Sequence, residues 1–268
     1  MQADAPPIAT PDPISRLAEE QTLHNVAPKS APVKAVLVLD QTGSAQKHRI
    51  KFEAENLRPL FNTLIEVGGE LAFFLICDEG EQPALRLRIP EPPLIKVNEA
   101  DHLDPYVQPE TDGNPFHLAE AQAEYAAQLK TNQTLIEQHR QILEDHQQTA
   151  KAELELFLQD LESFLNEDMV CPTTDLWGAI ARADLILAEP TTVWSVSPTK
   201  YALFITDGID TVGQPEVTFT SELEVILING SGNTGIFSRL PHSRFESTMS
   251  ALDHIVASVE QTTPQEGK

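Results

Sequence analysis

Four segments of the chain contain a continuous apolar run, a pattern typical of strands that are buried on both faces of a sheet. They span 33–39, 70–77, 200–207 and 222–229. Apolar residues at helical spacing mark three further segments, at 52–67, 175–187 and 246–259. A strand, a helix and a second strand follow one another within 33–77, which predicts a βαβ unit with a right-handed crossover. We therefore expect an α/β fold with a doubly wound, mostly parallel sheet.

An insertion at 78–170 separates the two halves of this α/β pattern. It begins with a predicted β-hairpin, whose arms at 84–90 and 94–97 are joined by a Glu-Pro-Pro turn. After a connector, residues 116–171 contain neither glycine nor proline and keep a mostly three-to-four spacing of apolar residues, which predicts a coiled-coil-like helix. Asn132, His139 and His146 interrupt the apolar seam. Either one long helix or a helical hairpin fits, with turns at 131–133 or 146–149.

The remaining segment, 1–32, is rich in proline and lacks periodicity, so we expect a largely disordered leader with one short helical piece at 14–20. The two parts of the α/β pattern, 33–77 and 171–262, would then form one domain around the insertion. Clustered apolar residues of both parts would supply its core.

The net charge of the chain narrows the classes of partner that it could bind. The formal net charge is −23, from 41 acidic and 18 basic residues, which argues against binding to nucleic acid or to an anionic membrane surface. The insertion carries about half of the acids and a third of the bases, so its helix would suit a basic partner. With two cysteines, no membrane-length apolar run and no basic-then-apolar start, the chain is expected to be cytoplasmic.

Oxygen-bearing side chains gather where the first predicted strand ends. Asp40, Thr42 and Ser44 follow one another at alternate positions around a turn at Gly43. Carboxylate and hydroxyl oxygens are the ligands of hard divalent cations such as Mg²⁺ or Mn²⁺. The carboxyl ends of parallel strands share one edge, where ligands bind in open α/β sheets.

Two distant segments complete a recognisable pattern. Thr174 precedes a predicted helix, with Ala179-Ile180 five residues on, and Asp207-Gly208 ends a later predicted strand. Together with Asp40-x-Thr42-x-Ser44, these elements resemble the metal-ion-dependent adhesion site of von Willebrand factor type A (vWA) domains. The resemblance covers the parts outside the leader and the insertion. It departs from the family where Pro172 replaces a usual glycine and where Thr42 replaces the commoner serine.

The resemblance implies what this site does. Asp40, Thr42, Ser44, Thr174 and Asp207 would hold Mg²⁺ or Mn²⁺, directly or through water, with Thr173 as a substitute for Thr174. An octahedral ion would keep one free position, and a Glu or Asp of a partner protein would fill it. The expected function is therefore metal-dependent protein binding without catalysis.

Other functions remain alternatives. The chain could be an accessory subunit of an ATPase or chelatase complex, or a scaffold that binds through the acidic helix. A metal-dependent hydrolase is less favoured, because Thr42 stands where haloacid dehalogenases need a second Asp. A Ser44 nucleophile would need a base, and His48 has no evident orienting acid. The Gly-x-Gly-x-x-Gly pattern at 230–235 precedes Pro241 too closely for a dinucleotide site, so a flexible loop is preferred.

Overall fold

The computed structural model describes residues 30–42, 52–76, 84–93, 115–166, 173–190, 194–213, 216–220, 222–229 and 234–261. The chain divides into two compact units. We call residues 28–92 with 146–268 the sheet unit, and residues 1–27 with 93–145 the helical unit. The expected leader lies outside the described residues, apart from its last few positions. In the part of the chain that is described, no helix has the length and apolarity needed to cross a membrane.

A six-stranded sheet forms the centre of the sheet unit, with strand order β3-β2-β1-β4-β5-β6. Its strands are β1 (Val33–Asp40), β2 (Gly69–Ile76), β3 (Leu85–Ile89), β4 (Thr199–Ile205), β5 (Glu224–Ile228) and β6 (Ser243–Phe245). β3 runs antiparallel to β2, and every other neighbouring pair is parallel. The predicted α/β class with a mostly parallel sheet is therefore confirmed.

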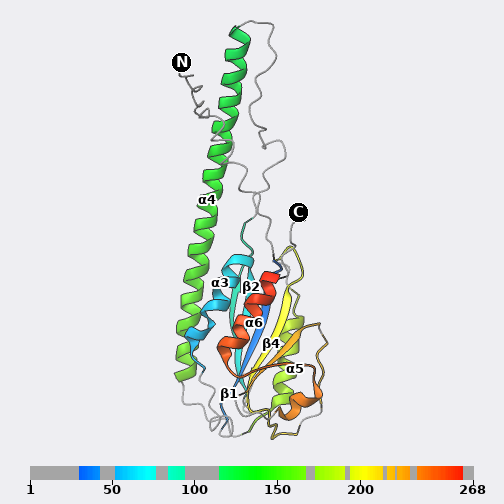
Figure 1. The fold of residues 1–268 in the computed structure, drawn as a ribbon. Coiled ribbons are helices and arrows are strands. Elements are labelled where there is room, and N and C mark those ends of the chain that lie inside the picture. Colours follow the sequence, from blue (N-terminus) through cyan, green and yellow to red (C-terminus); the bar gives the residue numbers. More distant parts are fainter. Residues whose placement is uncertain are drawn as a thin grey trace, which may run out of the picture. The chain divides into compact units, whose positions relative to one another are not determined.

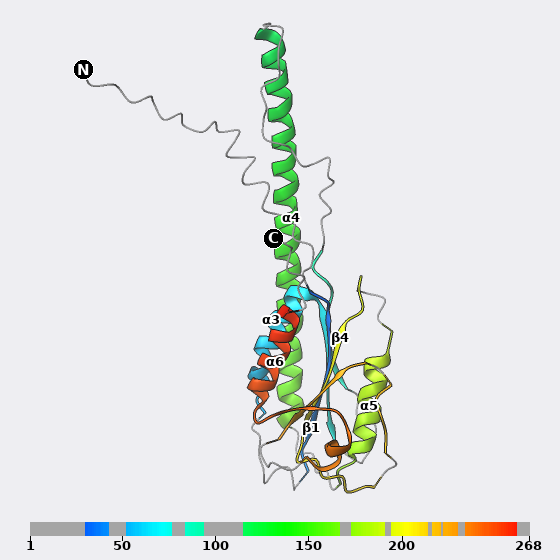
Figure 2. The ribbon, with the colours of Figure 1, turned by 45° about the vertical axis from the view of Figure 1, so that its right-hand side comes forward.

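Helices cover both faces of this sheet (Figure 1). One face carries α3 (Arg58–Val67), which follows the short helix η1 (Ala54–Leu57), together with α6 (Thr248–Gln261) and the last turns of α4 (Pro115–Asn166). The other face carries α5 (Leu176–Ala188) and the short helix η3 (Gly235–Arg239). The turned view separates α3 and α6 from α5 across the strands (Figure 2).

The residues of β1 alternate between two apolar cores. Leu37 and its odd-numbered neighbours join the core under α3, α4 and α6, whereas Val36 and Val38 join the core under α5. Every residue of β1 is buried. The continuous apolar pattern that predicted this strand thus reflects packing on two faces rather than one.

The first predicted hairpin arm, 84–90, contains strand β3, which pairs with β2 in the main sheet, a pairing that the sequence analysis did not foresee. Leu87 and Ile89 are buried in the core on one face, and Arg86 and Arg88 lie on the other face beside Glu70 of β2. This alternation suits an edge strand paired with β2. The second predicted arm, 94–97, lies outside the described residues.

The predicted long helix is a single helix, α4, of 52 residues. It continues through 131–133 and 146–149, where the sequence also allowed a turn. Its last turns belong to the sheet unit, and they contribute Ala150, Leu154, Phe157, Leu158 and Leu161 to the core. The end of the expected insertion is therefore part of the sheet unit's core, because its apolar residues have a sheet face to cover.

Replacing a core residue of α4 tests this packing. Phe157 is 5% exposed and meets the ring of Phe61 edge-on at 6.1 Å between centroids. We expect Phe157→Ala to lower the free energy of unfolding by about 3–5 kcal/mol, since it removes buried apolar contacts and leaves a cavity. Leu156 is 61% exposed on the same turn, and Leu156→Ala should change stability by less than about 0.5 kcal/mol. Urea titrations of both variants measure the difference; equal losses would mean that α4 does not cover the sheet.

Candidate metal site at the carboxyl edge of the sheet

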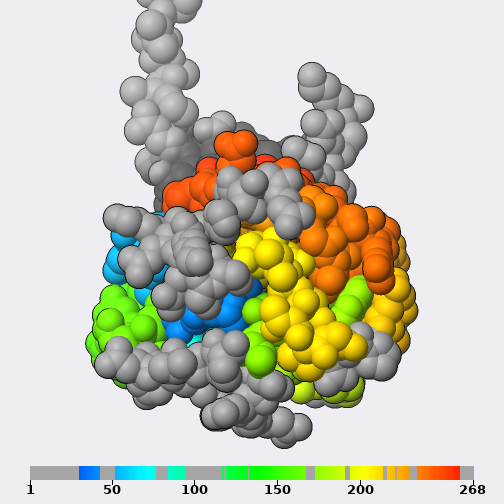
Figure 3. Space-filling view, turned by 90° about the horizontal axis from the view of Figure 1, so that it is seen from below, coloured from blue at the N-terminus to red at the C-terminus, as the bar shows by residue number. Residues whose placement is uncertain are grey.

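The sheet topology brings the predicted metal ligands to one edge. β1 ends at Asp40 and lies beside β4, which ends at Ile205, so that Thr206 and Asp207 follow at the same level. The end of β1 and the segment after β4 meet on the surface seen from below the strands, in blue and yellow in Figure 3. Thr174 reaches this edge from the turn that precedes α5.

A chain of hydrogen bonds joins three of the predicted ligands. Thr174 Oγ1 donates to Thr42 Oγ1 at 2.9 Å, and Thr42 Oγ1 donates to Asp40 Oδ1 at 2.7 Å. The Thr42 backbone N–H also donates to Asp40 Oδ1, at 2.9 Å. Asp40, Thr42 and Thr174 are 6%, 4% and 1% exposed. Side chains that lie 132 positions apart in the sequence are therefore in direct contact, as the parallel-sheet argument requires.

Asp207 contributes a carboxylate with one oxygen unsatisfied. Its Oδ1 accepts a hydrogen bond from the Ile209 N–H at 3.0 Å. Asp207 is only 3% exposed, and its buried Oδ2 has no hydrogen-bond partner among the described residues. A buried carboxylate oxygen without a donor is costly, since it has lost its water. A cation placed against this oxygen would remove that cost.

The electrostatics at Asp40 also indicate that this edge needs a positive charge. Burial raises the pKa of the Asp40 carboxyl above its ordinary value of 3.8, and the charge of Asp207 raises it further. Hydrogen bonds from Thr42 and Thr206 oppose this increase. Two neighbouring buried carboxylates thus repel each other, as expected for a site whose counter-charge is a bound cation.

Thr206 is a site residue that the sequence interpretation missed. Its Oγ1 donates to Asp40 Oδ2 at 2.7 Å and accepts a hydrogen bond from the Gly208 N–H at 3.1 Å. It orients Asp40 from the far side, so that both carboxylate oxygens are held. The available signal was its position directly before Asp207, at the end of a buried strand adjacent to β1.

The loop after β4 is fixed against the start of α5. Asp210 Oδ1 accepts from the Leu176 N–H at 2.9 Å, while Thr211 Oγ1 accepts from the Thr174 N–H at 2.8 Å and the Thr211 N–H donates to Thr174 O at 2.9 Å. Asp175 caps α5 by accepting from the Gly178 N–H. Thr174 and Asp207 are therefore held by one bonded frame, and their separation does not depend on a loose loop.

The backbone around Gly235, the last glycine of the pattern at 230–235, explains why a glycine stands there. Its N-terminal neighbour Thr234 and the loop at Gly208 approach so closely that a Cβ on Gly235 would lie 1.7 Å from Gly208 O. Gly208 and Gly235 also have positive φ angles, of 78° and 49°. This glycine serves backbone packing beside the candidate site, and it is the first residue of the five-residue helix η3, where a dinucleotide site would need a long helix.

The remaining predicted ligands have different outcomes. Ser44, like His48 and Pro172, lies outside the described residues, so its part in the site stays a prediction. Thr173, the expected substitute for Thr174, has a buried Oγ1 without a hydrogen-bond partner among the described residues. Thr173 and Thr174 thus place two adjacent hydroxyls near this edge, and of these two, within the described residues, only that of Thr174 has a hydrogen-bond partner.

The chemistry of the donor set favours a hard cation. Within the described ranges, no group of three or more His, Cys, Asp or Glu side chains gathers to hold a metal. The donors at this edge are hydroxyls and only two carboxylates, which suits Mg²⁺ or Mn²⁺ rather than a thiolate- or imidazole-binding metal. A site of this kind would leave the bound ion with much of its positive charge.

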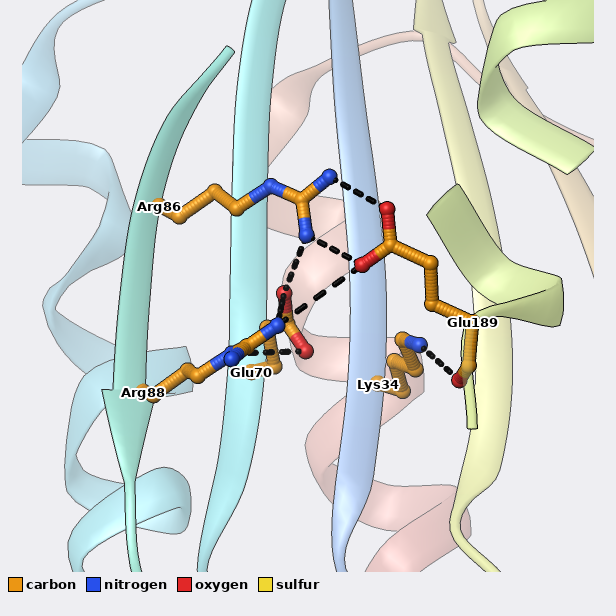
Figure 4. A network of polar contacts seen from close by, with 5 residues as sticks. All are labelled: Lys34, Glu70, Arg86, Arg88 and Glu189. Atoms are coloured by element: carbon orange, nitrogen blue, oxygen red, sulfur yellow. Dashed lines mark hydrogen bonds and ion pairs between the residues drawn. The ribbon is translucent and has the colours of Figure 1, made fainter. Parts of the chain in front are cut away.

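A second polar network provides a contrast within the same unit (Figure 4). Lys34 and Glu70 are paired in register at the start of β1 and β2 and are 1% and 0% exposed. Lys34 Nζ donates to the Glu189 carbonyl at 2.9 Å, Arg86 binds the Glu189 carboxylate with both terminal nitrogens, and Arg88 Nε lies 3.3 Å from Glu70 Oε2.

Opposite charges are matched in that network. Burial lowers the pKa of Lys34, and the charges of Glu70 and Glu189 raise it. Because Glu189 is the residue that ends α5, the network attaches this end of the helix to the sheet. It therefore has a structural explanation, whereas the carboxyl edge combines two acids that repel each other.

Comparisons with protein-family models, with curated proteins and with solved structures found no match to this chain. The functional interpretation therefore rests on the arrangement of its residues.

The pKa of Asp40 makes a prediction about pH. Because its folded pKa is raised, the folded protein keeps the Asp40 proton where the unfolded chain has lost it. Between the unfolded value, near 3.8, and the higher folded value, stability falls as pH rises, by up to about 1.4 kcal/mol per pH unit. Above that window the loss is constant.

The variant Asp40→Asn has no carboxyl at position 40 that could titrate. In chelator, wild type should therefore lose stability relative to Asp40→Asn as pH increases from about 4 to about 7, measured by urea unfolding. Asp253→Asn, which removes an exposed carboxylate on α6, is the matched control and should show no such trend. Parallel pH profiles for wild type and Asp40→Asn would contradict a raised Asp40 pKa.

Proposed function

We propose that this chain is a protein-binding module that depends on a divalent cation, Mg²⁺ or Mn²⁺, held by Asp40, Thr42, Ser44, Thr174 and Asp207. One observation carries the proposal: among the described residues, the buried Oδ2 of Asp207 has no hydrogen-bond partner, and it lies beside Asp40, which is linked to the hydroxyls of Thr42, Thr174 and Thr206. The sheet with helices on both faces supports a doubly wound arrangement of the vWA type. The cation site would then correspond to the adhesion site of that family.

In this proposal the side chains of the site orient one another and the cation, and the cation neutralises the two carboxylates. A bound cation would offset the repulsion between Asp40 and Asp207, and the lone pairs of Thr42 and Thr174 would face it. Thr206 would keep Asp40 from rotating away. Because hydroxyls carry no charge, the ion would remain attractive to a further carboxylate. A Glu or Asp of a partner protein is the proposed occupant of the remaining ligand position.

Recognition suits this site better than hydrolysis does. Thr42 is hydrogen-bonded to Asp40 and Thr174, and it stands where phosphohydrolases of the dehalogenase type need a second carboxylate. Both oxygens of Asp40 accept hydrogen bonds from neighbouring threonines, which makes it a poor nucleophile. We therefore propose binding, with nucleotide hydrolysis left to a partner if the chain belongs to an ATPase or chelatase assembly.

Calorimetric titration with Mg²⁺ and Mn²⁺ tests the metal site directly. We expect wild type to give a saturable binding signal, and both Asp40→Ala and Asp207→Asn to weaken it at least tenfold, since each removes one of the two carboxylates. The control Asp253→Asn should bind as wild type does. At a free cation concentration near 100 times the dissociation constant, binding should also stabilise the fold by about 2.7 kcal/mol. Equal signals for wild type and Asp40→Ala would disprove the site.

Partner capture tests the role of the cation. Tagged protein incubated with extract of the native cell should retain its partner in Mg²⁺ and lose it in chelator, and Asp207→Asn should fail to retain it in either buffer. The acidic-helix alternative predicts the opposite dependence. In that case capture would persist in chelator and would weaken when exposed acids of α4, such as Glu124, Glu137 and Glu144, are changed to Gln. Substitution is preferable to deleting 78–170, because that deletion would remove β3 and core residues of α4.

A further inference from the structure

The helical unit presents an apolar strip along α4 that is independent of the candidate metal site. We define the α4 stripe as Leu135, Ile136, His139, Ile142 and Leu143. Their spacing of one, three, three and one places them on one face of the helix. Leu135 and Ile142 are 42% and 45% exposed, which is high for large aliphatic side chains, and the other three are half-buried.

Part of the stripe repeats after seven residues. Ile136 and Leu143, preceded by Leu129, occupy one position of the heptad, which we call a in the usual order; Leu135 and Ile142 occupy position g, and His139 occupies position d. Further along α4, the a residues Ala150 and Phe157 pack in the core of the sheet unit, so the a position marks the side of this helix that contacts a neighbour. Leu129, at the start of the series, is already buried in the chain, so the surface open to a partner begins beyond it.

Charge on α4 is distributed in a way that selects the partner. Over residues 122–149, Arg140 is the one charged residue at positions a, d, e and g. The acids of this stretch, Glu124, Glu137, Glu144 and Asp145, all fall at positions b and c, outside the apolar face. Arg140 itself pairs with Glu137 and Glu144 on its own helix. The face is thus free of like charge in a chain whose net charge is −23.

This distribution distinguishes two kinds of occupant. A basic partner would be recognised by several acids within or beside the contact, but the stripe has none in its own face and one, Asp145, at its margin three residues from Ile142. A second copy of the same chain needs the reverse, an apolar face on which two strongly acidic molecules meet without opposed carboxylates. The stripe meets that requirement, because its e neighbour Arg140 is paired with Glu137 and Glu144 of its own helix, and the e residues before and after it, Gln133 and Gln147, are uncharged.

We propose that the α4 stripe is a self-association surface, on which the α4 helices of two copies of this chain pack against each other. The contact is a few helical turns long, which points to a reversible dimer rather than an obligate one. This proposal does not depend on the proposed cation site, whose ligands lie in the sheet unit.

Sedimentation of the full-length protein tests the proposal. From about 1 to about 100 μM, wild type should shift from monomer toward dimer. The double variant Leu135→Lys/Ile142→Lys should weaken the association at least tenfold, because it places four lysines in one dimer interface. The matched control is Gln141→Lys/Gln148→Lys, which adds the same charge to the same helix at position f, on the opposite side. This control should dimerise as wild type does.

Circular dichroism of each variant shows whether α4 keeps its helix content, so that loss of folding is not mistaken for loss of association. Three results would overturn the proposal. They are a wild type that stays monomeric over the whole range, association that both double variants weaken equally, and association that neither weakens. The first result would fit residues of the same chain covering the stripe, the second a general charge effect, and the third an interface elsewhere.

Discussion

The parallel pairing of β1 with both β2 and β4 is the constraint on which the sheet unit depends. A strand with neighbours on both sides has no free edge, and its side chains must be buried on both faces. Two apolar cores follow, one under α3, α6 and the end of α4 and the other under α5. The same pairing aligns the ends of β1 and β4. Asp40 and Asp207 are close because the backbones of these two strands are in register.

The two ends of the sheet unit differ in how their buried charges are compensated. Where the strands begin, Lys34, Glu70, Arg86 and Glu189 compensate one another, so the cost of removing them from water is offset within the protein. Where β1 and β4 end, the carboxylates of Asp40 and Asp207 are held by hydroxyls and backbone N–H groups, which orient them without cancelling their charge. Two buried carboxylates that are oriented but not neutralised lower the stability of the fold, a frequent property of functional sites.

The sequence predicted what depends on local pattern and strand order. Continuous apolar runs identified β1, β2, β4 and β5, and the rule that parallel strands share a carboxyl edge predicted that Thr174 and Thr42 lie close together, as they do. Pairings that depend on tertiary contacts were not predictable. Arg86 and Arg88 gave β3 an alternating pattern that suits a hairpin arm as well as an edge strand. The three residues of β6 are too few to show a period.

Similar limits apply to the candidate site and to α4. Thr206 was missed because a threonine at a strand end has many local roles, and its bond to Asp40 spans 166 positions. The helical spacing of α4 was visible, but spacing alone does not say that Phe157 covers a sheet while Leu143, two heptads earlier, is half-buried. Both belong to the same apolar repeat. What separates them is whether a sheet face lies within reach, which is a property of the fold.

The arginines of β3 have a consequence for the state of the protein in solution. Among the described strands β3 is an outer one, and the backbone groups of an outer strand can pair with a strand from another molecule. Arg86 and Arg88 place two long cationic side chains along this short strand, and Glu70 and Glu189 hold them over one face of the sheet. A strand added at this edge would lie beside these two cationic side chains, and charged side chains on an outer strand disfavour such pairing. The arginines that attach the end of α5 to the sheet thus also act against edge-to-edge pairing.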